Sequence, residues 1–447
     1  MDTQAPQRDR RPRRPSLSPT FGWRRPAAAI LLGIAAQARA GSEVLTWPGS
    51  PGCQATLQAC LDAAEAGDVV EIATDDPIGD IVQIFGKSLT LRPAPGFQPV
   101  FQPDMFTNAI NVFGADQPVS IVVEGMIVRG ATINAYQAGS GAFDVSIRGN
   151  RIEAQDLDAN RTAISLTPFG SAPTGPVNFE FAGNEIALGF LSGDDIAAIG
   201  IEDLAGSTSG SITRNTVSVG GTMSTYAAIQ VHNAAGTLEF DAIANRIDAP
   251  GYNGGIAIIQ DDASGNLVAR VVDNLVVGTD YVMGVQPGAV SVLVTAGSGE
   301  LLVANNTLAD NDTGFFADAA SGASLAGVFA NNIVAGNSRK GVVIDALVEP
   351  TFGNDHNLVS GNADDDFVPG PGTLLVDPLF VGAGDYHLQP TTPARDAGND
   401  THVPDDITTD LDGAPRIIGT AVDIGAYERP DSIFADGFEE SVPTSPQ

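Results

Sequence analysis

One asparagine recurs through the middle of this 447-residue chain at nearly regular intervals. It is followed two residues later by Ile, Leu or Val, and in most units an apolar residue stands three positions before it. Successive copies are 25–34 residues apart, so the pattern is an internal repeat. The repeat asparagines are Asn150, Asn184, Asn215, Asn245, Asn274, Asn306, Asn332 and Asn357.

Each repeat unit is predicted to contain a short strand, a turn at the asparagine and another short strand. Asn suits such a turn because it tolerates left-handed backbone angles and forms local hydrogen bonds. Strands that recur without intervening amphipathic helices predict coils stacked in parallel, an all-β solenoid of the parallel β-helix type. Where the turns stack, we expect a hydrogen-bonded ladder of Asn side chains. A propeller would need units of about 40 residues with four antiparallel strands, and a sandwich would not repeat one turn residue in register.

The first 40 residues differ sharply in composition from the rest. They hold eight Arg and two Asp, and they include the apolar run 27–36 and the small-residue ending 38–40. A basic stretch, a short apolar stretch and such an ending are typical of a cleaved signal peptide. Residues 1–40 are therefore predicted to be a signal peptide, with an N-terminal anchor or a misassigned start of the chain as the alternatives. The apolar run is too short for an integral membrane span, which takes about 20 residues.

Without residues 1–40 the chain has 14 basic and 52 acidic residues, a net charge of −38. Such a charge repels nucleic acids and anionic membranes, because it offers no surface that neutralises phosphates. It also disfavours a polyanionic sugar unless a metal ion bridges the two. The composition favours a soluble exported protein, or one that binds cations.

The two cysteines, Cys53 and Cys60, are close together, and in an exported chain they are expected to form a disulfide. The amphipathic stretch 55–66 predicts a helix that caps the first coil. On one continuous helix the cysteines would lie roughly 10 Å apart, whereas a disulfide needs Cα atoms within about 7 Å. Cys53 is therefore expected in a loop before the helix. Residues 41–95 are predicted to form the N-terminal cap and the first coil.

A different set of motifs follows the repeats. In order, they are VDPLF at 376, GDYHL at 384, PARDAG at 393, DLDGAPR at 410, VDIGAYE at 422 and IFADGFE at 433.

The Asn-x-apolar units and the helical start resemble the right-handed parallel β-helix repeat proteins of the pectate-lyase-like superfamily, over residues 45–375. This resemblance implies a single right-handed β-helix, with repeats over 96–375. Residues 376–428 resemble the choice-of-anchor Q region of bacterial β-helix proteins and are expected to be a closing segment. The tail, 429–447, is expected to be flexible, and its last motif resembles a segment of many exported bacterial proteins. These two C-terminal resemblances imply an exported or cell-surface location, but neither implies a reaction.

A second pattern lies between the Asn turns, namely a strand, polar residues and a turn that closes on Gly. It occurs at 197–206, 227–236, 256–265 and 314–322. Alignment on the closing Gly places Glu202, His232 and Asp261 at one position of adjacent coils. Asp318 lies two coils beyond Asp261. Because side chains alternate along a strand and coils lie about 4.8 Å apart, these residues are expected to form a polar row on the outer face.

Three interpretations of this row remain open. Two carboxylates and an imidazole can perform acid–base catalysis, and the candidate catalytic residues are Glu202, His232 and Asp261. Carboxylates can instead bind Ca²⁺, and the candidate metal ligands are Asp203, Asp262 and Asp318. In a chain this acidic, the row is otherwise a solvated polar face.

The catalytic sets of the family are not matched. Pectate lyases of the superfamily use Arg or Lys beside Ca²⁺-binding acids, whereas the only Lys residues here are Lys87 and Lys340. The polygalacturonase motifs are missing except for the Asp-Asp element, for which Asp261–Asp262 is the candidate pair. The leading hypothesis is therefore an exported, monomeric protein that binds an extended polymer, such as a polysaccharide or another cell-envelope polymer. The alternatives are a Ca²⁺-assisted polysaccharide lyase or a glycoside hydrolase, and a surface adhesin or structural spacer.

Overall fold

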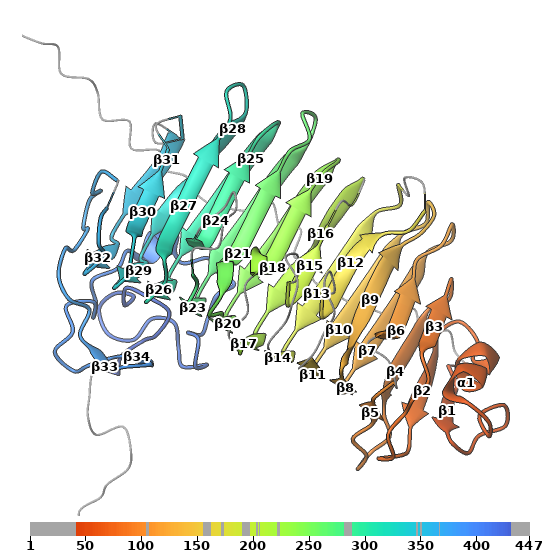
Figure 1. The fold of residues 1–447 in the computed structure, drawn as a ribbon. Coiled ribbons are helices and arrows are strands. Elements are labelled where there is room, and N and C mark those ends of the chain that lie inside the picture. Colours follow the sequence, from red (N-terminus) through yellow and green to blue (C-terminus); the bar gives the residue numbers. More distant parts are fainter. Residues whose placement is uncertain are drawn as a thin grey trace, which may run out of the picture. The chain divides into compact units, whose positions relative to one another are not determined.

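The structure is a computed structural model. It describes residues 42–430 except 104–106, 155–161, 171–173, 190–196, 203, 205, 221–223, 281–287, 346, 349–350 and 366. The described residues belong to one compact unit that begins at Ile34, and the predicted signal peptide and residues 431–447 lie outside them. Within the described part, strands form a right-handed parallel β-helix of about 10 turns (Figure 1), so the predicted fold class is confirmed.

Each full coil contributes one strand to each of three parallel sheets, A, B and C, which the chain visits in the order C, A, B. Sheet A consists of β1 (Val44–Trp47), β2 (Asp68–Ile72), β4 (Leu89–Pro93), β7 (Val119–Glu124), β10 (Phe143–Arg148), β13 (Val177–Ala182), β16 (Ser207–Thr213), β19 (Thr237–Ile243), β22 (Asn266–Val272), β25 (Ser298–Ala304), β28 (Ser324–Ala330) and β31 (Phe352–Asp355).

Sheets B and C have ten strands each in the described part of the chain. Sheet B consists of β5 (Val100–Phe101), β8 (Ile127–Arg129), β11 (Arg151–Ala154), β14 (Glu185–Leu188), β17 (Thr216–Val219), β20 (Arg246–Asp248), β23 (Leu275–Val277), β26 (Thr307–Ala309), β29 (Ile333–Ala335) and β32 (Leu358–Ser360). Sheet C consists of β3 (Val82–Phe85), β6 (Thr107–Phe113), β9 (Ala131–Gln137), β12 (Ile164–Pro168), β15 (Ile199–Ile201), β18 (Ser224–Asn233), β21 (Tyr252–Gln260), β24 (Gly288–Val294), β27 (Thr313–Ala319) and β30 (Lys340–Ile344).

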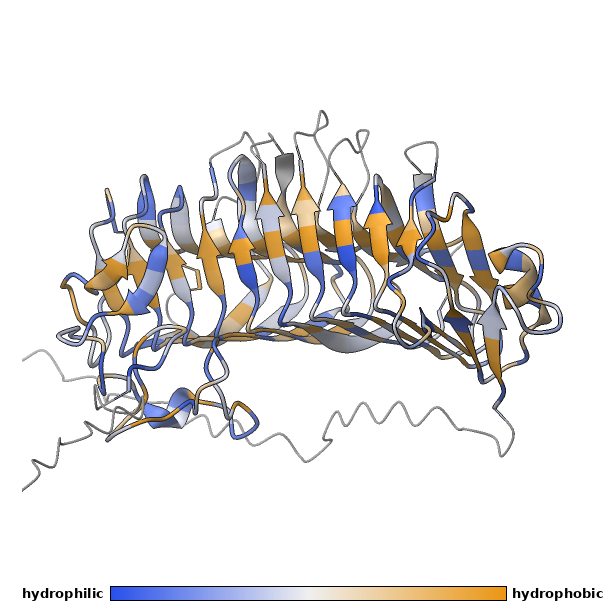
Figure 2. Cartoon of the chain, turned by 90° about the horizontal axis from the view of Figure 1, so that it is seen from below, coloured by the Kyte–Doolittle hydropathy of each residue, from blue (hydrophilic) through white to orange (hydrophobic). Residues whose placement is uncertain are grey.

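The core lies between the three sheets because alternate side chains of each strand point inward. This alternation of hydrophobic and hydrophilic residues is visible along the strands in Figure 2. In sheet C the parallel register stacks six fully buried isoleucines above one another, one per coil. They are Ile110, Ile133, Ile164, Ile199, Ile229 and Ile256. The β-branched side chains favour strands, so the residues that fill the core also favour the strand conformation.

A ladder of buried asparagines joins the coils where sheet A turns into sheet B, as predicted. Asn184 shows the pattern: its Nδ2 donates to the carbonyl of Ile147 at 2.9 Å and to Oδ1 of Asn215 at 3.0 Å. Its own Oδ1 accepts the backbone N–H of Asn150 at 3.0 Å. All eight repeat asparagines are at most 1% exposed and take part in this ladder. The ladder satisfies backbone groups that the turn would otherwise bury without a partner.

The left-handed backbone position of the turn is not the ladder Asn, which corrects the sequence interpretation. The residue directly before each ladder Asn has a φ between 49° and 62°. These residues are Gly149, Gly183, Arg214, Ala244, Asp273, Asn305, Asn331 and His356. Six of the eight are not Gly, although a positive φ is uncommon for other residues. The ladder hydrogen bonds that follow hold the backbone in this conformation.

The N-terminal helix α1 (Leu57–Ala63) is shorter than the predicted stretch and contacts β1 and β3. Its first turn is capped by Thr56, whose Oγ1 accepts the N–H of Ala59 at 3.1 Å. Its last carbonyls are capped by Lys87, whose Nζ donates to Leu61 O and, at 2.7 Å, to Ala64 O. Burial lowers the pKa of Lys87, and nearby acids oppose that shift. That α1 acts as a cap of the solenoid stays a prediction.

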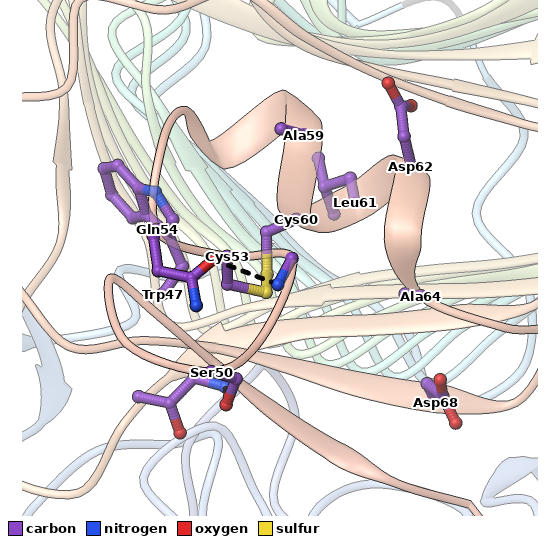
Figure 3. The surroundings of a disulfide bond; sticks show 12 residues. Trp47, Ser50, Cys53, Gln54, Ala59, Cys60, Leu61, Asp62, Ala64 and Asp68 are labelled. Atoms are coloured by element: carbon purple, nitrogen blue, oxygen red, sulfur yellow. Dashed lines mark hydrogen bonds between the residues drawn. A yellow bond between two sulfur atoms is a disulfide. The ribbon is translucent and has the colours of Figure 1, made fainter.

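Cys53 and Cys60 form a disulfide in the structure (Figure 3). Cys53 lies in the loop before α1 and Cys60 within it, and their Cα atoms are 4.2 Å apart. Both are fully buried. The bond therefore ties the entry loop to the helix.

The closing segment, 376–428, packs along the flank of sheet B. It contains the antiparallel strands β33 (Phe380–Gly382) and β34 (Asp385–Leu388) and the 3₁₀-helix η2 (Asp400–His402). Three of its apolar side chains share a cluster with the outer surface of β29 and β32. These are Leu388, Ala394 and Ile424. The outer surface of sheet B explains this placement. Its last strands present apolar residues such as Ile333 and Leu358 to the closing segment. Its first strands carry charged residues instead, namely Arg129, Arg151 and Glu185.

Arg416 anchors the closing segment to the solenoid through buried charges. It is 2% exposed, and its guanidinium donates to Asp273 Oδ1 at 3.0 Å and to Glu428 Oε1 at 2.8 Å. Burial raises the pKa of Asp273 to about 7 and that of Glu428 to about 8, although the charge of Arg416 opposes both shifts. Burial also raises the pKa of nearby Asp423 to about 6. One guanidinium therefore faces more buried carboxyl groups than it can neutralise.

No helix in the described part of the chain is long and apolar enough to cross a membrane.

The ladder predicts a large stability loss for Asn274→Ala. The substitution leaves the N–H of Asn245 and the carbonyl of Ala242 buried without this partner, and each such group costs about 1–3 kcal/mol. We expect a loss of at least about 2 kcal/mol in the free energy of urea unfolding. Asn266→Ala is the matched control, because this exposed Asn of the same coil bonds only the hydroxyl of Ser298 among described residues. A loss below about 0.5 kcal/mol for both variants would show that the ladder contributes little.

The Arg416 cluster predicts that the closing segment loses stability as pH rises. Because their pKa values are raised, these carboxyl groups hold protons in the folded state that they release on unfolding. Their contribution is complete below the ordinary carboxyl pKa of about 4 and is lost as pH rises through about 6 to 8. Hydrogen exchange of residues 410–428 should therefore be faster at pH 9 than at pH 6, after correction for the intrinsic rates.

Asp273→Asn separates this effect from the general repulsion of an acidic chain. Asn fits the left-handed backbone of this position and removes the titrating group. The variant should show a flatter dependence of protection on pH than the parent protein. Equal dependence in both proteins would contradict the assignment.

Candidate functional site

The register of sheet C aligns one outward-facing side chain per coil in a single line, which we call the outer row. It consists of Phe85, Phe113, Tyr136, Thr167, Glu202, His232, Ile259, Leu293, Asp318 and Asp345. All of these except Phe113 are partly or largely exposed. The chemistry changes along the row from aromatic to polar and ionisable, then to aliphatic and finally to acidic.

His232 and Asp261 are in direct contact, as the sequence alignment suggested. His232 Nε2 lies 2.8 Å from Asp261 Oδ2, and the two side chains are 25% and 39% exposed. Glu202 stands in the outer row one coil before His232, because Ile201 pairs with Val231. The structure therefore brings the three candidate catalytic residues onto adjacent coils of one face.

Asp261 is not in register with His232, however, which corrects the predicted alignment. The partner of His232 in β21 is Ile259, so Asp261 lies two residues further along. The reason is a turn that is two residues longer: three residues separate Asn233 from Thr237, whereas five separate Gln260 from Asn266. Alignment on the closing Gly placed this insertion in the strand. Asp261 reaches His232 from the turn that follows β21.

The candidate metal ligands do not converge. Asp262 accepts the N–H of Gly236 at 2.8 Å and that of Ser264 at 3.0 Å, and these bonds lower its pKa. It therefore organises the turn. Asp318 lies in the outer row two coils beyond β21, and Asp203 lies outside the described residues. The described residues contain no group of three or more His, Cys, Asp or Glu side chains placed to hold a metal ion.

Four aromatic rings form a cluster at the N-terminal part of the outer face. Phe85 stacks on Phe113 at a centroid distance of 4.0 Å, and Phe113 stacks on Tyr136 at 4.8 Å. The ring of Phe169 is turned by 80° from that of Phe113, at 5.3 Å. Phe85 and Phe169 are 55% and 54% exposed. The stacked rings lie one per coil, so their planes are roughly perpendicular to the long axis of the solenoid and they present their edges. The ring of Phe169 is nearly perpendicular to them, so its plane lies along that axis.

A network of buried and half-buried polar side chains lies beside the aromatic cluster. Asn108 Nδ2 donates to the hydroxyl of Tyr136 at 3.2 Å and accepts at Oδ1 from Thr132, also at 3.2 Å. Asn134 joins this network by donating to Thr132 at 2.8 Å and accepting from Ser165 at 2.6 Å. These bonds hold polar side chains in fixed orientations, and they position Tyr136.

Sequence analysis missed the aromatic cluster and this network. The aromatic residues precede the first repeat Asn, Asn150, so the asparagine pattern does not set their alignment. The turn before it uses Gly125 and Met126, and the N–H of Met126 donates to Asn150 Oδ1 at 3.0 Å. A usable signal was the spacing of 28 and 23 residues between Phe85, Phe113 and Tyr136. This spacing is close to the repeat length. It can be recognised as part of the repeat only if the register of the coils that lack the ladder Asn is known.

Comparison with known proteins found weak overall similarity to solved structures. No family model matches the sequence, and no curated protein matches it. The solved structure of pectate lyase Pel9A is 12% identical, with a TM-score of 0.43 over 88% of this chain and 98% of that one. XylC in complex with xylose is 10% identical, with a TM-score of 0.47 over 87% of this chain and 98% of that one. Identities this low concern the course of the backbone and assign no site residue.

Proposed function

We propose that this protein binds an extended polysaccharide along the outer row of sheet C. The observation that carries the proposal is the in-register outer row, in which stacked aromatic rings lead directly to Thr167, Glu202 and His232. Exposed apolar surface next to polar groups is typical of binding sites. The row advances by about 4.8 Å per coil, so a ligand that follows it is long and repetitive.

The ligand is proposed to be a neutral sugar chain. None of the ten outer-row residues is Lys or Arg, and three of them are Glu or Asp. The chain has a net charge of −32, so a polyuronate would be repelled. Sugar rings offer apolar C–H faces that pack on aromatic rings, and their hydroxyl groups can bond the polar part of the row. Phe169 supports this best, because the plane of its exposed ring lies along the solenoid.

The proposal includes export of the protein and a monomeric state. Export, with residues 1–40 as the signal peptide, would bring the protein to polysaccharides outside the cell. A monomer suffices, because the outer row is formed within one chain. A spacer or adhesin would use the same solenoid but would not need the outer row to bind a sugar. Attachment of the protein to the cell surface without retention on any polysaccharide would favour that alternative.

A second candidate function, hydrolysis or lyase chemistry, is favoured by one observation. His232 and Asp261 are 2.8 Å apart, and Glu202 stands on the adjacent coil. A carboxylate that orients an imidazole, beside a second carboxylate, is an arrangement that supports proton transfer. Calcium would be needed to hold an anionic substrate, yet Asp262 is engaged in its own turn. Hydrolysis of a neutral chain is therefore the form of catalysis that the row supports better.

The binding proposal predicts that Phe169→Ala weakens retention on neutral polysaccharides. We expect about a tenfold rise in Kd, equivalent to about 1.4 kcal/mol, by affinity electrophoresis or calorimetry with xylan, glucan and mannan oligomers. Phe97→Ala is the matched control, because this ring is 37% exposed but belongs neither to the outer row nor to the aromatic cluster that contains Phe169. Equal affinity of both variants, or preference of the parent protein for polygalacturonate, would refute the proposal.

The catalytic alternative predicts that the release of reducing ends, or of unsaturated products, depends on the His232–Asp261 pair. His232→Ala and Asp261→Ala should each abolish such activity while binding persists. Phe169→Ala should weaken binding and activity together. Activity that survives both substitutions at the pair would remove this site, and absence of activity in the parent protein would leave binding as the function.

A further inference from the structure

The outer row is straight over its first six coils, and this limits the shape of a ligand that follows it. From Phe85 to Thr167 the outer-row residues are paired directly in the parallel register. Glu202 and His232 continue the line, one coil at a time. Adjacent coils lie about 4.8 Å apart, so these six residues span roughly 24 Å. A chain that contacts all of them must stay extended over this distance.

The aromatic and polar part of the row has two definite ends. It begins at Phe85, because β3 is the first strand of sheet C in the described part of the chain. After His232 the row becomes aliphatic, at Ile259 and Leu293. Aliphatic side chains offer no hydrogen bond to a sugar hydroxyl. The part of the row that suits a sugar chain therefore offers six positions, one per coil.

A second line of side chains accompanies this part of the row and has the same spacing. It is formed by the residues two positions earlier in each strand, which lie on the same face. Five of its six members carry an uncharged amide or hydroxyl group, and Gly200 is the sixth. The five are Gln83, Asn111, Asn134, Ser165 and Gln230. The face beside the row therefore repeats uncharged polar groups with the period of the coils.

The linkage between sugars decides whether a neutral chain can follow such a row. In a β-1,4-linked glucan or xylan, both bonds that join a sugar to its neighbours are equatorial, so the chain extends as a nearly straight ribbon. Each sugar then advances the chain by close to one coil spacing. An α-1,4-linked chain has an axial bond at each sugar, and a β-1,3-linked chain joins its sugars at an angle. Both therefore curve into helices and would leave the row after a few sugars.

The exposed ring of Phe169 fits the same ribbon. Phe169 is 54% exposed, and its ring is turned by 80° from that of Phe113, so its plane lies along the solenoid. In an extended ribbon the faces of the sugar rings also lie along the chain. One sugar can therefore lie flat on Phe169 while the chain continues along the row. In a helical chain the faces turn from one sugar to the next, and this match is lost.

We propose that the outer row selects β-1,4-linked neutral chains, such as glucan or xylan, and holds one sugar on each of the six coils from Phe85 to His232. This inference rests on the proposed binding of a neutral sugar chain and adds the linkage of that chain and its match to the coils.

The first test compares linkages by native gel electrophoresis of the full chain in gels that each contain one soluble neutral polysaccharide. Hydroxyethyl cellulose and arabinoxylan supply β-1,4 linkages, soluble starch supplies α-1,4 linkages, and laminarin supplies β-1,3 linkages. The Kd for the two β-1,4 polymers should be at least tenfold lower than for starch or laminarin. Phe169→Ala should weaken retention on the β-1,4 polymers, and Phe97→Ala should not.

The outcomes of this test separate the inference from the proposed function. Equal or tighter retention on starch or laminarin, lost in Phe169→Ala, would overturn the selection of β-1,4 linkages and leave sugar binding by the outer row in place. No retention on any of the four polymers would remove both. Retention on the β-1,4 polymers that is the same in Phe169→Ala and the parent protein would place their binding elsewhere and would also overturn the inference.

The second test measures by calorimetry how affinity depends on chain length. With cello- and xylo-oligosaccharides, affinity should rise with each added sugar up to about six, because each sugar occupies one more coil, and should then level off. Malto-oligosaccharides of the same lengths are the matched control, and they should gain no affinity beyond the first two or three sugars. A plateau at two sugars in the β-1,4 series, or an equal gain in the malto series, would overturn the match of one sugar to each coil.

Discussion

The buried asparagine ladder is the interaction on which the rest of the structure depends. Each ladder side chain bonds one coil to the next through both the backbone and the neighbouring Asn. A parallel sheet could slip by two residues and still bury its apolar side chains, but a ladder Asn that slips leaves buried polar groups without partners. The ladder therefore fixes the register of every coil from Asn150 onward. A fixed register turns similar residues in successive coils into continuous rows, inside as the isoleucine stack and outside as the outer row.

Two Arg residues attach the closing segment to the solenoid through ion pairs. Arg270 holds Asp241 of β19 and Asp406 of the closing segment in two fork-shaped ion pairs, and Arg416 holds Asp273 and Glu428. Bidentate geometry suits Arg better than Lys. Arg270 lies in β22 of sheet A, and Asp273 lies in the turn that follows this strand. These two contacts fix the closing segment to the flank of the solenoid.

The sequence was sufficient for the features that repeat and for the single disulfide, but not for the other features that occur once. The Asn spacing predicted the solenoid and the ladder, since a periodic constraint appears many times in the chain. Cys53 and Cys60 could be paired because only two cysteines exist and helix geometry excluded one continuous helix. The offset of Asp261 could not be predicted, because a two-residue insertion has the same sequence signature in a turn as in a strand. The Phe85–Phe113–Tyr136 stack was missed because it lies in coils without the ladder Asn. The path of the closing segment depended on which outer side chains of sheet B are apolar, and this required the register.

We propose that the polymer binds to the outer row. A crystal structure of the full chain with a bound neutral oligosaccharide tests this most directly. The expected result is a sugar chain that runs parallel to the solenoid over sheet C, with one ring against Phe169 and hydroxyl groups within hydrogen-bond distance of Glu202 or His232. An oligosaccharide bound only elsewhere, with the outer row unoccupied at a concentration well above the Kd in solution, would contradict it.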